Sequence, residues 1–256
     1  MKKLLLLPLL LIISFSLVGE DNYALSLEKD LLLGASALGL NIPGMVLSSG
    51  AQNNMTLDDI NSLDRNLAFF KYNKTQDDIS TLLAAGILTF PVLTPLFQFE
   101  DLNTWVTYGV MYAEAFLLTN GAKDLLKSLI ARNRPYTYTS IPPSQVSDYF
   151  NSFPSGHTAY AFLGATFLST TFSKEYPDSP WKLPLIISSY TLAAGVGTMR
   201  LTSGNHFLTD VLAGAALGAL FGWGIPFLHE MGPKKESGLY ITPTPKAFSI
   251  GFRSNL

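Results

Sequence analysis

Long uncharged stretches alternate with short polar ones along the chain. A helix needs about 20 apolar residues to cross a bilayer, with a range of roughly 17 to 25. Most of the six uncharged windows, residues 31–57, 79–99, 102–113, 158–173, 183–199 and 211–228, are near that length. The third continues past Glu114 to residue 122, and an intramembrane carboxylate must face the bundle or a wet cavity. The pattern predicts an all-α, membrane-embedded bundle of about six helices; the alternative for the third window is an amphipathic helix of a soluble bundle.

The segments around these windows have patterns of their own. The last window carries small residues that let neighbouring helices approach closely, namely Ala213, Gly214, Ala216, Gly218 and Gly222. Residues 55–80 mix charges with apolar positions such as Leu63 and Leu67, which suits a helix at a membrane interface. In residues 136–152, Tyr136 and Tyr138 are candidate interfacial anchors. After residue 232, a polar tail alternates like a strand around Ile250.

The N-terminus has the pattern of an export signal. Lys2 and Lys3 precede an almost unbroken apolar run to Val18. The small-x-small pattern for cleavage is matched only loosely at residues 17–19, so the segment is either a cleaved signal or an uncleaved anchor. We therefore divide the chain into an export segment at 1–19, an N-terminal region at 20–78, a catalytic bundle at 79–230 and a polar tail at 231–256.

Composition supports a membrane protein and excludes several classes of site. Of the 256 residues, 48% are hydrophobic and only 14% are charged, whereas charged residues supply about a quarter of a typical soluble domain. The net charge of -2 gives no electrostatic signal for nucleic acid. The chain has no cysteine, which excludes disulfides, thiolate nucleophiles and cysteine-ligated metals, and three histidines are few for a histidine-built metal site. We expect no metal and no cofactor.

Candidate chemistry begins just ahead of the last window. Arg200, His206 and Asp210 follow one another at short intervals. If a helix starts near Asn205, a good N-cap residue, His206 and Asp210 lie on one face of its first turns. The alternative is a helix N-terminus that favours an aspartate near its positive dipole end and has a histidine nearby.

Two further clusters reach the same end of the bundle. Residues 127–135 follow the third window, and residues 153–157 open the fourth. In an up-and-down bundle these two clusters and residues 200–210 all lie on one face. The side chains brought together are Lys127, Arg134, Ser155, Gly156, His157, Arg200, His206 and Asp210.

This set predicts an anion site with acid and base chemistry. Arginine forks match phosphate oxygens, lysine adds a point charge, and a Ser-Gly turn at a helix N-terminus supplies N–H donors. Phosphoryl transfer through a covalent intermediate needs one neutral imidazole to attack phosphorus and one protonated imidazole to protonate the leaving oxygen. We expect Asp210 to accept a hydrogen bond from His206 and make it the nucleophile, with His157 as the acid and later the base.

The three clusters resemble the signature of the type 2 phosphatidic acid phosphatase family, which shares its fold with vanadium haloperoxidases and bacterial class A acid phosphatases. The family pattern is K-x6-R-P, then P-S-G-H, then S-R-x5-H-x3-D, and the chain departs from it only at Met199, where the pattern has serine. The resemblance implies that His206, Asp210 and His157 are catalytic. It also implies phosphate binding by Lys127, Arg134, Ser155, Gly156 and Arg200. His229 matches no motif, and we expect a helix-end residue there.

The motifs and composition together predict a metal-independent phosphatase that hydrolyses a lipid phosphomonoester or diphosphate through a phosphohistidine. Phosphatidate, phosphatidylglycerophosphate, polyprenyl diphosphate and lipid A all stay open as substrates. The alternatives are a soluble periplasmic acid phosphatase of the same superfamily, a vanadate-dependent haloperoxidase and a non-catalytic membrane phosphate-binding protein. Membrane lipid is the expected partner; nucleic acid is not expected, and the sequence indicates no protein partner.

The predicted location is a bacterial cell membrane with the active site facing the periplasm. Counting every window as a span after an export segment would instead place the site in the cytoplasm. Window 31–57 contains Asn41, Pro43, Ser48 and Ser49, so we expect it not to span and to lie against the outer surface or the bundle. Lys234 and Lys235 then face inward, in agreement with the positive-inside rule.

Overall fold

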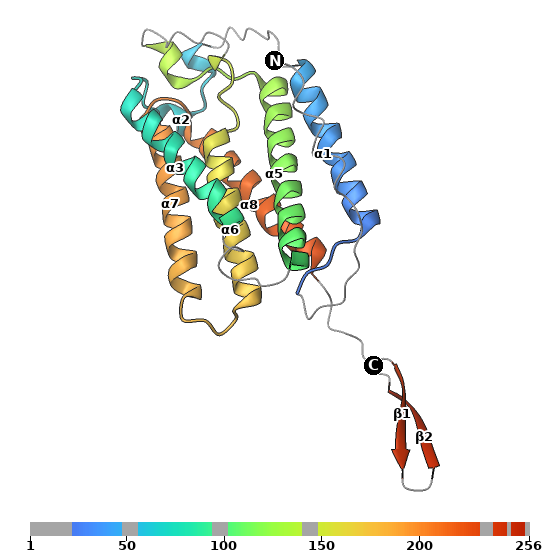
Figure 1. Ribbon diagram of the computed structural model, residues 1–256. Coiled ribbons are helices and arrows are strands. Elements are labelled where there is room, and N and C mark those ends of the chain that lie inside the picture. Colours follow the sequence, from blue (N-terminus) through green and yellow to red (C-terminus); the bar gives the residue numbers. More distant parts are fainter. Residues whose placement is uncertain are drawn as a thin grey trace.

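Long helices form the body of the protein (Figure 1). The computed structural model describes residues 22–47, 56–93, 102–139, 148–230, 238–244 and 247–253. Within these ranges the long helices are α1 (Leu27–Leu47), α3 (Lys74–Leu93), α5 (Leu102–Ile130), α6 (Gly156–Glu175), α7 (Lys182–Thr202) and α8 (Leu208–His229). Each predicted window coincides with one of them, so the helical bundle is confirmed. The window that continues past Glu114 is one uninterrupted helix, α5.

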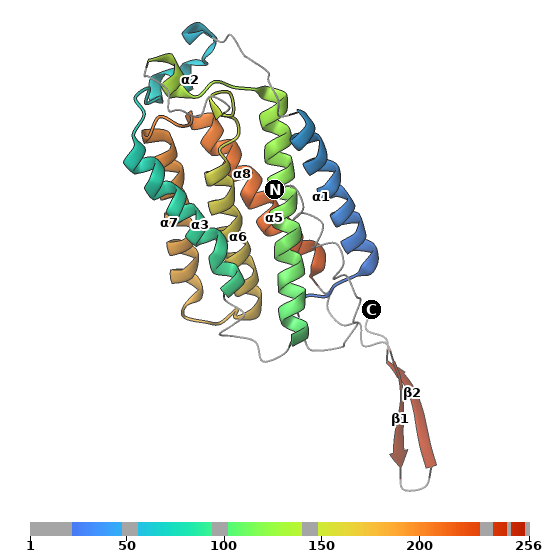
Figure 2. The same cartoon turned by 45° about the horizontal axis from the view of Figure 1, so that its top comes forward.

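The helices are arranged around α6. Figures 1 and 2 both show α6 between α3, α7 and α8, with α1 at the outer edge beside α5. The chain runs up and down between two ends of the bundle, so α5 and α7 finish at the end where α6 and α8 begin. We call this the upper end, as drawn in Figure 1, and the opposite one the lower end.

A row of glycines brings α8 against α6. Gly214, Gly218 and Gly222 recur every four residues and therefore face one side of α8. A Cβ added at Gly218 would lie 2.0 Å from the carbonyl oxygen of Ala159, and one at Gly214 would lie 2.4 Å from that of Ser155. Only hydrogen fits at these positions, which confirms the close packing predicted from the small residues.

Helix α1 packs along the side of the bundle rather than lying flat on the outer surface of the membrane. It contacts α5 and runs in the same direction, since both begin at the lower end (Figure 1). Its start is fixed beside the end of α8, because the backbone N–H of Ala24 donates to the carbonyl of His229 at 3.0 Å and Tyr23 forms a β-bridge with Glu230. Window 31–57 thus lies against the bundle, as predicted, for the part that α1 covers, but α1 runs along α5 from the lower to the upper end, which contradicts the expectation that it does not span.

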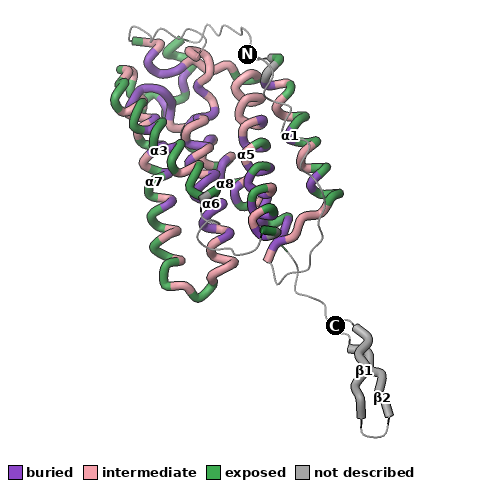
Figure 3. Tube along the Cα trace, viewed as in Figure 1, coloured by how far each residue is buried: buried purple, intermediate pink, exposed green. Residues whose placement is uncertain are grey.

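Large apolar side chains cover the outside of the bundle. Figure 3 shows exposed positions along the outer faces of the helices, while buried positions gather in the interior and at the upper end. Leu82, Phe90, Leu183, Ile187, Leu220 and Trp223 are 50–75% exposed. By length and composition, α8 is the one helix among the described residues that is apolar enough to cross a membrane.

The remaining elements are short. Residues 56–73 contain the 3-10 helix η2 (Leu57–Asp59) and the six-residue helix α2 (Ser62–Leu67), so the helix predicted within 55–80 is short, and residues 74–80 belong to α3. The 3-10 helix η3 (Pro135–Tyr138) follows α5. Its Tyr136 is buried against Tyr72, which contradicts its predicted role as an interfacial anchor.

The strand predicted in the tail is confirmed. Strand β1 (Gly238–Thr244) pairs antiparallel with β2 (Ala247–Arg253), and Ile241 lies opposite Ile250. The predicted export segment 1–19 lies outside the described residues, as do Lys234 and Lys235.

Candidate active site

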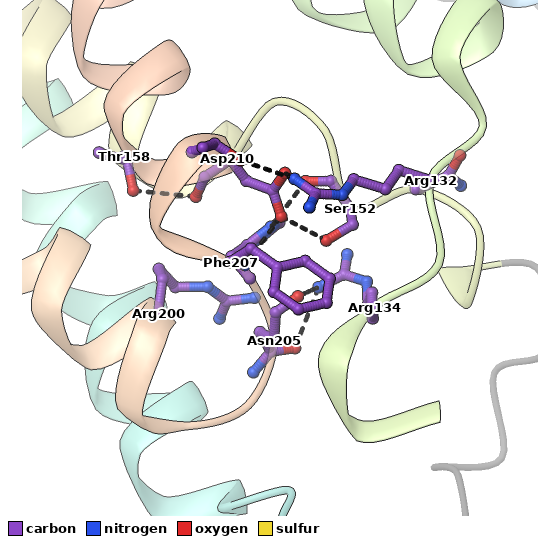
Figure 4. Close-up of polar contacts among 12 residues, drawn as sticks. Arg132, Arg134, Ser152, Thr158, Arg200, Asn205, Phe207 and Asp210 are labelled. Atoms are coloured by element: carbon purple, nitrogen blue, oxygen red, sulfur yellow. Dashed lines mark hydrogen bonds and ion pairs between the residues drawn. The ribbon is translucent and has the colours of Figure 1, made fainter. Parts of the chain in front are cut away.

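The three sequence clusters lie together at the upper end of the bundle (Figure 4). Residues 148–155 connect them. The carbonyl of Asn151 accepts a hydrogen bond from Lys127 Nζ, and the carbonyl of Ser152 accepts one from His206 Nδ1. The backbone N–H of Ser155 donates to the carbonyl of Asp210 at 2.9 Å. This short loop therefore joins the end of α5 to the starts of α6 and α8.

His206 is buried, with 1% of its surface exposed. Its Nδ1 lies 2.7 Å from the carbonyl oxygen of Ser152, which can only accept, so Nδ1 carries the proton and Nε2 of the neutral ring has a free lone pair. Burial, followed by the positive charges of Arg134 and Arg200, holds the pKa of His206 well below its usual range. A neutral imidazole with a free Nε2 is the form that can attack phosphorus.

Asp210 does not contact His206 as predicted. Its Oδ2 lies 3.8 Å from His206 Nδ1, beyond hydrogen-bond distance, and instead accepts from Ser152 Oγ at 2.6 Å and from the backbone N–H of Phe207 at 2.8 Å. The expected direct hydrogen bond is therefore wrong. Asp210 holds Ser152, whose carbonyl orients His206, so the predicted tautomer is obtained through one intermediate residue.

The predicted helix start is also wrong. Helix α8 begins at Leu208, with Phe207 at the N-cap position, and Asn205 lies in the preceding turn. His206 thus precedes the helix and shares no helical face with Asp210. The amide of Asn205 is used elsewhere, because its Oδ1 accepts from Arg134 at 3.0 Å and its Nδ2 donates to Ser203 at 2.8 Å.

Arg132 bridges two buried carboxylates. Its Nη1 lies 2.6 Å from Asp210 Oδ1 and its Nη2 lies 2.8 Å from Asp64 Oδ2 (Figure 4 shows the first contact). The guanidinium also stacks over the Phe207 ring at 4.2 Å. Asp64, from α2, accepts from the backbone N–H of Thr209 at 2.9 Å and therefore satisfies a free donor at the start of α8.

The charge of Asp64 is stabilised by these contacts. Burial acts to raise the pKa of Asp64, but the hydrogen bonds from Thr209 and Arg132 outweigh it and leave the pKa below its usual value. Asp64 and Asp210 each pair with Arg132, and Asp77 pairs with Arg200. Each of these three carboxylates is paired with an arginine, and they are not arranged to coordinate a metal ion together.

Arg200 keeps one edge of its guanidinium open. Its Nη1 pairs with Asp77 and donates to Ser80 Oγ at 3.2 Å, both on α3. Its Nε is buried and has no hydrogen-bond partner among the described residues. A buried N–H without a partner is costly, and a phosphate oxygen would satisfy it.

The other two predicted cations, Arg134 and Lys127, differ in how many of their N–H groups already have hydrogen-bond partners. Arg134 donates from Nε to the carbonyl of Asp148 at 2.8 Å, pairs with the Asp148 carboxylate at 2.7 Å, and donates from Nη1 to Asn205. Lys127 donates to the carbonyl of Asn151, which leaves two of its three N–H groups for other acceptors. Arg200 and Lys127 are therefore better placed than Arg134 for direct contact with an anion.

His157 lies in the first turn of α6 and reaches α3. Its Nε2 is 3.1 Å from Thr81 Oγ1, while the Thr81 hydroxyl donates to the carbonyl of Asp77 at 2.9 Å. Helix α6 begins at Gly156 with Ser155 at the N-cap, so the first backbone N–H groups of α6 lie beside His157. An anion at this position would meet N–H donors, as the Ser-Gly turn predicted.

Several residues of the site were not predicted from the sequence, namely Asp64, Asp77, Thr81, Arg132 and Ser152. Arg132 lay inside a recognised cluster, but its spacing from Arg134 does not predict that the two arginines have different partners. Ala131 ends α5 with φ 43°, the left-handed conformation common at helix ends, and the chain then extends. Alternation in an extended segment would place Arg132 and Arg134 on the same side, yet Arg132 pairs with Asp64 and Asp210 whereas Arg134 pairs with Asp148. Asp64 and Asp77 gave no comparable signal.

Comparison with protein families gives one match that covers the site. Residues 106–232 match the family model described as the PAP2 superfamily. This range contains Lys127, His157, Arg200, His206 and Asp210. The family resemblance inferred from the motifs is confirmed.

Named relatives each match less than half of this chain. A lipid A 1-phosphatase of Porphyromonas gingivalis is 45% identical over 73 residues, which are 28% of this chain and 15% of the relative. Lipid phosphate phosphatase 1 of Arabidopsis thaliana is 33% identical over 135 residues, 44% of this chain and 41% of the relative. The bacitracin transport permease protein BcrC of Bacillus licheniformis is 34% identical over 134 residues, 49% and 60% respectively. The chain thus spans less than half of the length of the first two relatives.

A solved structure shares the fold. The transmembrane PAP2 type phosphatidylglycerolphosphate phosphatase from Bacillus subtilis aligns with a TM-score of 0.51 and 23% identity, over 75% of this chain and 95% of that one. This likeness supports the arrangement of the helices.

Proposed function

Since residues 106–232 belong to the PAP2 superfamily, we propose that this protein is a membrane phosphatase that hydrolyses a lipid phosphomonoester or diphosphate through a phosphohistidine. The observation that carries this proposal is the state of His206. Its proton is held on Nδ1 by the Ser152 carbonyl, the ring is buried and neutral, and positive side chains surround it. This arrangement leaves Nε2 as a nucleophile beside a place for an anion.

The reaction uses two steps. The phosphate binds to the open Nε edge of Arg200, to Lys127 and to the N–H groups at the start of α6. His206 Nε2 attacks phosphorus, the bond from phosphorus to the leaving oxygen breaks, and protonated His157 gives that oxygen its proton. Neutral His157 then takes a proton from water, whose oxygen attacks the phosphohistidine and releases phosphate. The cations stabilise the charge that develops on the phosphoryl oxygens.

A lipid substrate is supported by the apolar surface below the site. A groove of about 780 Å³ lies between α3, α6 and α7, and Leu82 and Leu83 at its wall directly follow Thr81, the contact of His157. The groove continues past Phe90 and Leu192. A phosphate held by Arg200 would therefore have an apolar surface beside it on which an acyl or prenyl chain can lie.

The exposed apolar belt argues against the soluble acid phosphatase. Side chains such as Leu82, Leu183 and Leu220 are more than half exposed, and such a surface is stable in lipid rather than in water. If the protein is embedded as proposed, it stays in the membrane fraction after a carbonate wash. Release into the supernatant would favour the soluble alternative.

We place the membrane-embedded site on the periplasmic face of a bacterial membrane. Lys234 and Lys235 follow α8 and suit the cytoplasmic side. The start of α1 lies beside the end of α8, so it shares that side, and α1, which runs along α5 to the upper end, then crosses the membrane as well. Alkaline phosphatase fused after Lys235 should be inactive in intact cells. An active fusion would reverse the orientation and place the site in the cytoplasm.

The decisive test of the activity is phosphate release from a panel of lipid phosphates with EDTA present. The panel contains phosphatidate, phosphatidylglycerophosphate, a polyprenyl diphosphate and lipid A. Wild type should release phosphate from at least one substrate. The rate of His206→Ala on that substrate should be lower by at least about 1,000-fold, because no nucleophile remains. Equal rates for the two proteins would overturn the mechanism. Halide oxidation by the vanadate-loaded protein without phosphate release would support a haloperoxidase instead.

A further inference from the structure

A second group of ionisable side chains is buried at the lower end of the bundle. Asp30 lies in the first turn of α1, Glu114 in the first half of α5, and His229 at the end of α8. His229 Nε2 is 3.0 Å from Asp30 Oδ1 and 3.4 Å from Glu114 Oε2. One ligand atom from each residue lies within 4.8 Å of the other two, and all three residues are at most 7% exposed.

The orientation of His229 is fixed by its other nitrogen. Nδ1 lies 3.0 Å from the carbonyl oxygen of Ile225, which can only accept, so Nδ1 carries a proton. In the neutral ring, Nε2 is then an acceptor, and it faces two carboxylate oxygens that are also acceptors. Three acceptors converging in a buried place require a proton or a metal ion between them.

No lysine or arginine among the described residues supplies a positive charge there. Glu114 Oε2 is buried and has no hydrogen-bond partner among the described residues. The nearby Lys29 donates instead to the carbonyl of Leu228, and Lys174 pairs with Glu230. A buried carboxylate oxygen aimed at an imidazole nitrogen, with no donor of its own, is an open ligand position.

We propose that Asp30, Glu114 and His229 bind a divalent transition-metal ion of the zinc class. One imidazole nitrogen and two carboxylate oxygens are suitable ligands, and the imidazole favours zinc-like ions over magnesium or calcium. Bonds of about 2.0–2.1 Å at tetrahedral angles place ligand atoms about 3.3–3.4 Å apart, close to the separations of His229 Nε2 from its two neighbours. The hydrogen bond from Nδ1 to a backbone carbonyl is the usual outer partner of a metal-binding histidine.

The ion has a structural role. Its ligands come from three helices, and two charged carboxylates with one divalent cation make the buried group neutral. The ion would fasten α1 to the end of α8, where Ala24 already bonds to the His229 carbonyl. His229 is 19 residues beyond Asp210 on α8, about 28 Å along the axis, so this site is independent of the proposed phosphatase chemistry.

The test is metal binding by the full-length protein in detergent. After treatment with a chelator and removal of the chelator, wild type is titrated with Zn²⁺, and its metal content is measured after dialysis. We expect one ion per chain and a rise in Tm of about 5 °C or more, with no comparable rise in Mg²⁺. Glu114→Gln and His229→Gln, which keep the approximate volume, should lose both the ion and the rise in Tm.

Two control variants distinguish metal binding at this site from metal binding by other carboxylates or histidines of the protein. Glu175→Gln removes a carboxylate at the same end that bonds to Tyr108 and Asn22 but not to His229, and it should keep the ion. His206→Ala should also keep it, because His206 lies at the other end. Wild type without a retained ion, or triad variants that bind as wild type does, would overturn the proposal. If a variant fails to fold, the wild-type titration alone decides.

Discussion

The two ends of the bundle hold histidines in the same tautomer but in opposite electrostatic surroundings. In His206 and His229 alike, Nδ1 donates to a backbone carbonyl, of Ser152 and Ile225 respectively, and Nε2 faces inward. At the upper end, Nε2 is surrounded by cations and suits an approaching anion. At the lower end it faces Asp30 and Glu114 and suits a cation.

The comparison shows that the local contacts of a histidine do not decide its chemistry. A carboxylate lies close to each ring, yet Asp210 is engaged by Arg132 whereas Glu114 has no arginine. The difference arises because the helices place positively charged side chains near one histidine and not near the other. Lysine and arginine residues of α5, α7 and the loop after α5 converge at the upper end, and none of the described residues delivers an equivalent cation to the lower triad.

The largest expected difference between the ends is in catalysis. His157→Ala should reduce kcat by about 100- to 10,000-fold, because the leaving oxygen loses its acid, while His229→Ala should leave kcat within about threefold of wild type at a temperature where both fold. Phosphate release per folded protein measures both rates. A similar loss in both variants would show that the two ends are not functionally separate.

The next largest effect concerns the arginines of the upper end. Arg200→Lys should reduce kcat/KM by about 100-fold or more, because lysine cannot present the open Nε edge to phosphate. Arg134→Lys should cost less, since its fork is already occupied by Asp148 and Asn205. The two variants are compared on one lipid phosphate. A larger loss for Arg134→Lys would mean that Arg134 leaves these partners when substrate binds.

A smaller effect is expected from Asp210→Asn. The carbonyl of Ser152, not the carboxylate, accepts the proton of His206 Nδ1, so the nucleophile keeps its tautomer and kcat should fall by only about 10- to 100-fold. The same change leaves Arg132 with one carboxylate and should lower Tm. Kinetics and thermal unfolding of the same preparation separate these effects. A loss as large as that of His206→Ala would restore a direct role for Asp210.

The smallest expected effect is on the pH dependence of stability. The pKa of His206 is lowered in the folded protein, so below the ordinary value of about 6.5 the unfolded chain binds a proton that the native ring does not. Stability from this group is complete above that pH and is lost as the pH falls toward the folded pKa. Between pH 7.5 and 5.5, Tm should therefore fall more for wild type than for His206→Ala. Equal slopes would contradict a buried neutral His206.

The same pair of histidines should govern the rate as the pH changes. We expect a bell-shaped profile of kcat/KM that reports values for the pair, because one ring must be neutral and the other protonated. Because the pKa of His206 is low, the fall of kcat/KM on the acidic side of the profile should lie below pH 6.5. A flat profile would count against the paired roles.

Much of this architecture could be predicted from the sequence because its signals are local. The uncharged windows predicted the helices, and alternation along the bundle predicted the end at which Lys127, His157 and His206 meet. The glycine row at Gly214 and Gly218 gave the tight packing of α8. These properties depend on composition and spacing within one element or between neighbouring elements.

The missed features depend on contacts between distant segments. Asp64 meets Thr209 across 145 positions, and Asp77 meets Arg200 across 123, so no periodicity relates them. The prediction for Asp210 failed because spacing of four residues was read as helical, whereas the chain turns before Leu208 and a backbone carbonyl takes the place of the carboxylate. His229 does end a helix, as predicted, but its partners come from α1 and α5 and so were not predicted.

The glycine row between α6 and α8 has a mechanical consequence. With carbonyl oxygens of α6 where side chains of α8 would stand, these helices cannot slide or rotate past each other without collision. His157 lies in the first turn of α6 and His206 lies just before the N-cap of α8, so the acid and the nucleophile belong to a single rigid body. If a bulky lipid enters or leaves by a movement of helices, the helices that move are those packed against α6 and α8. The main one is α3, which contacts the site through Asp77 and Thr81.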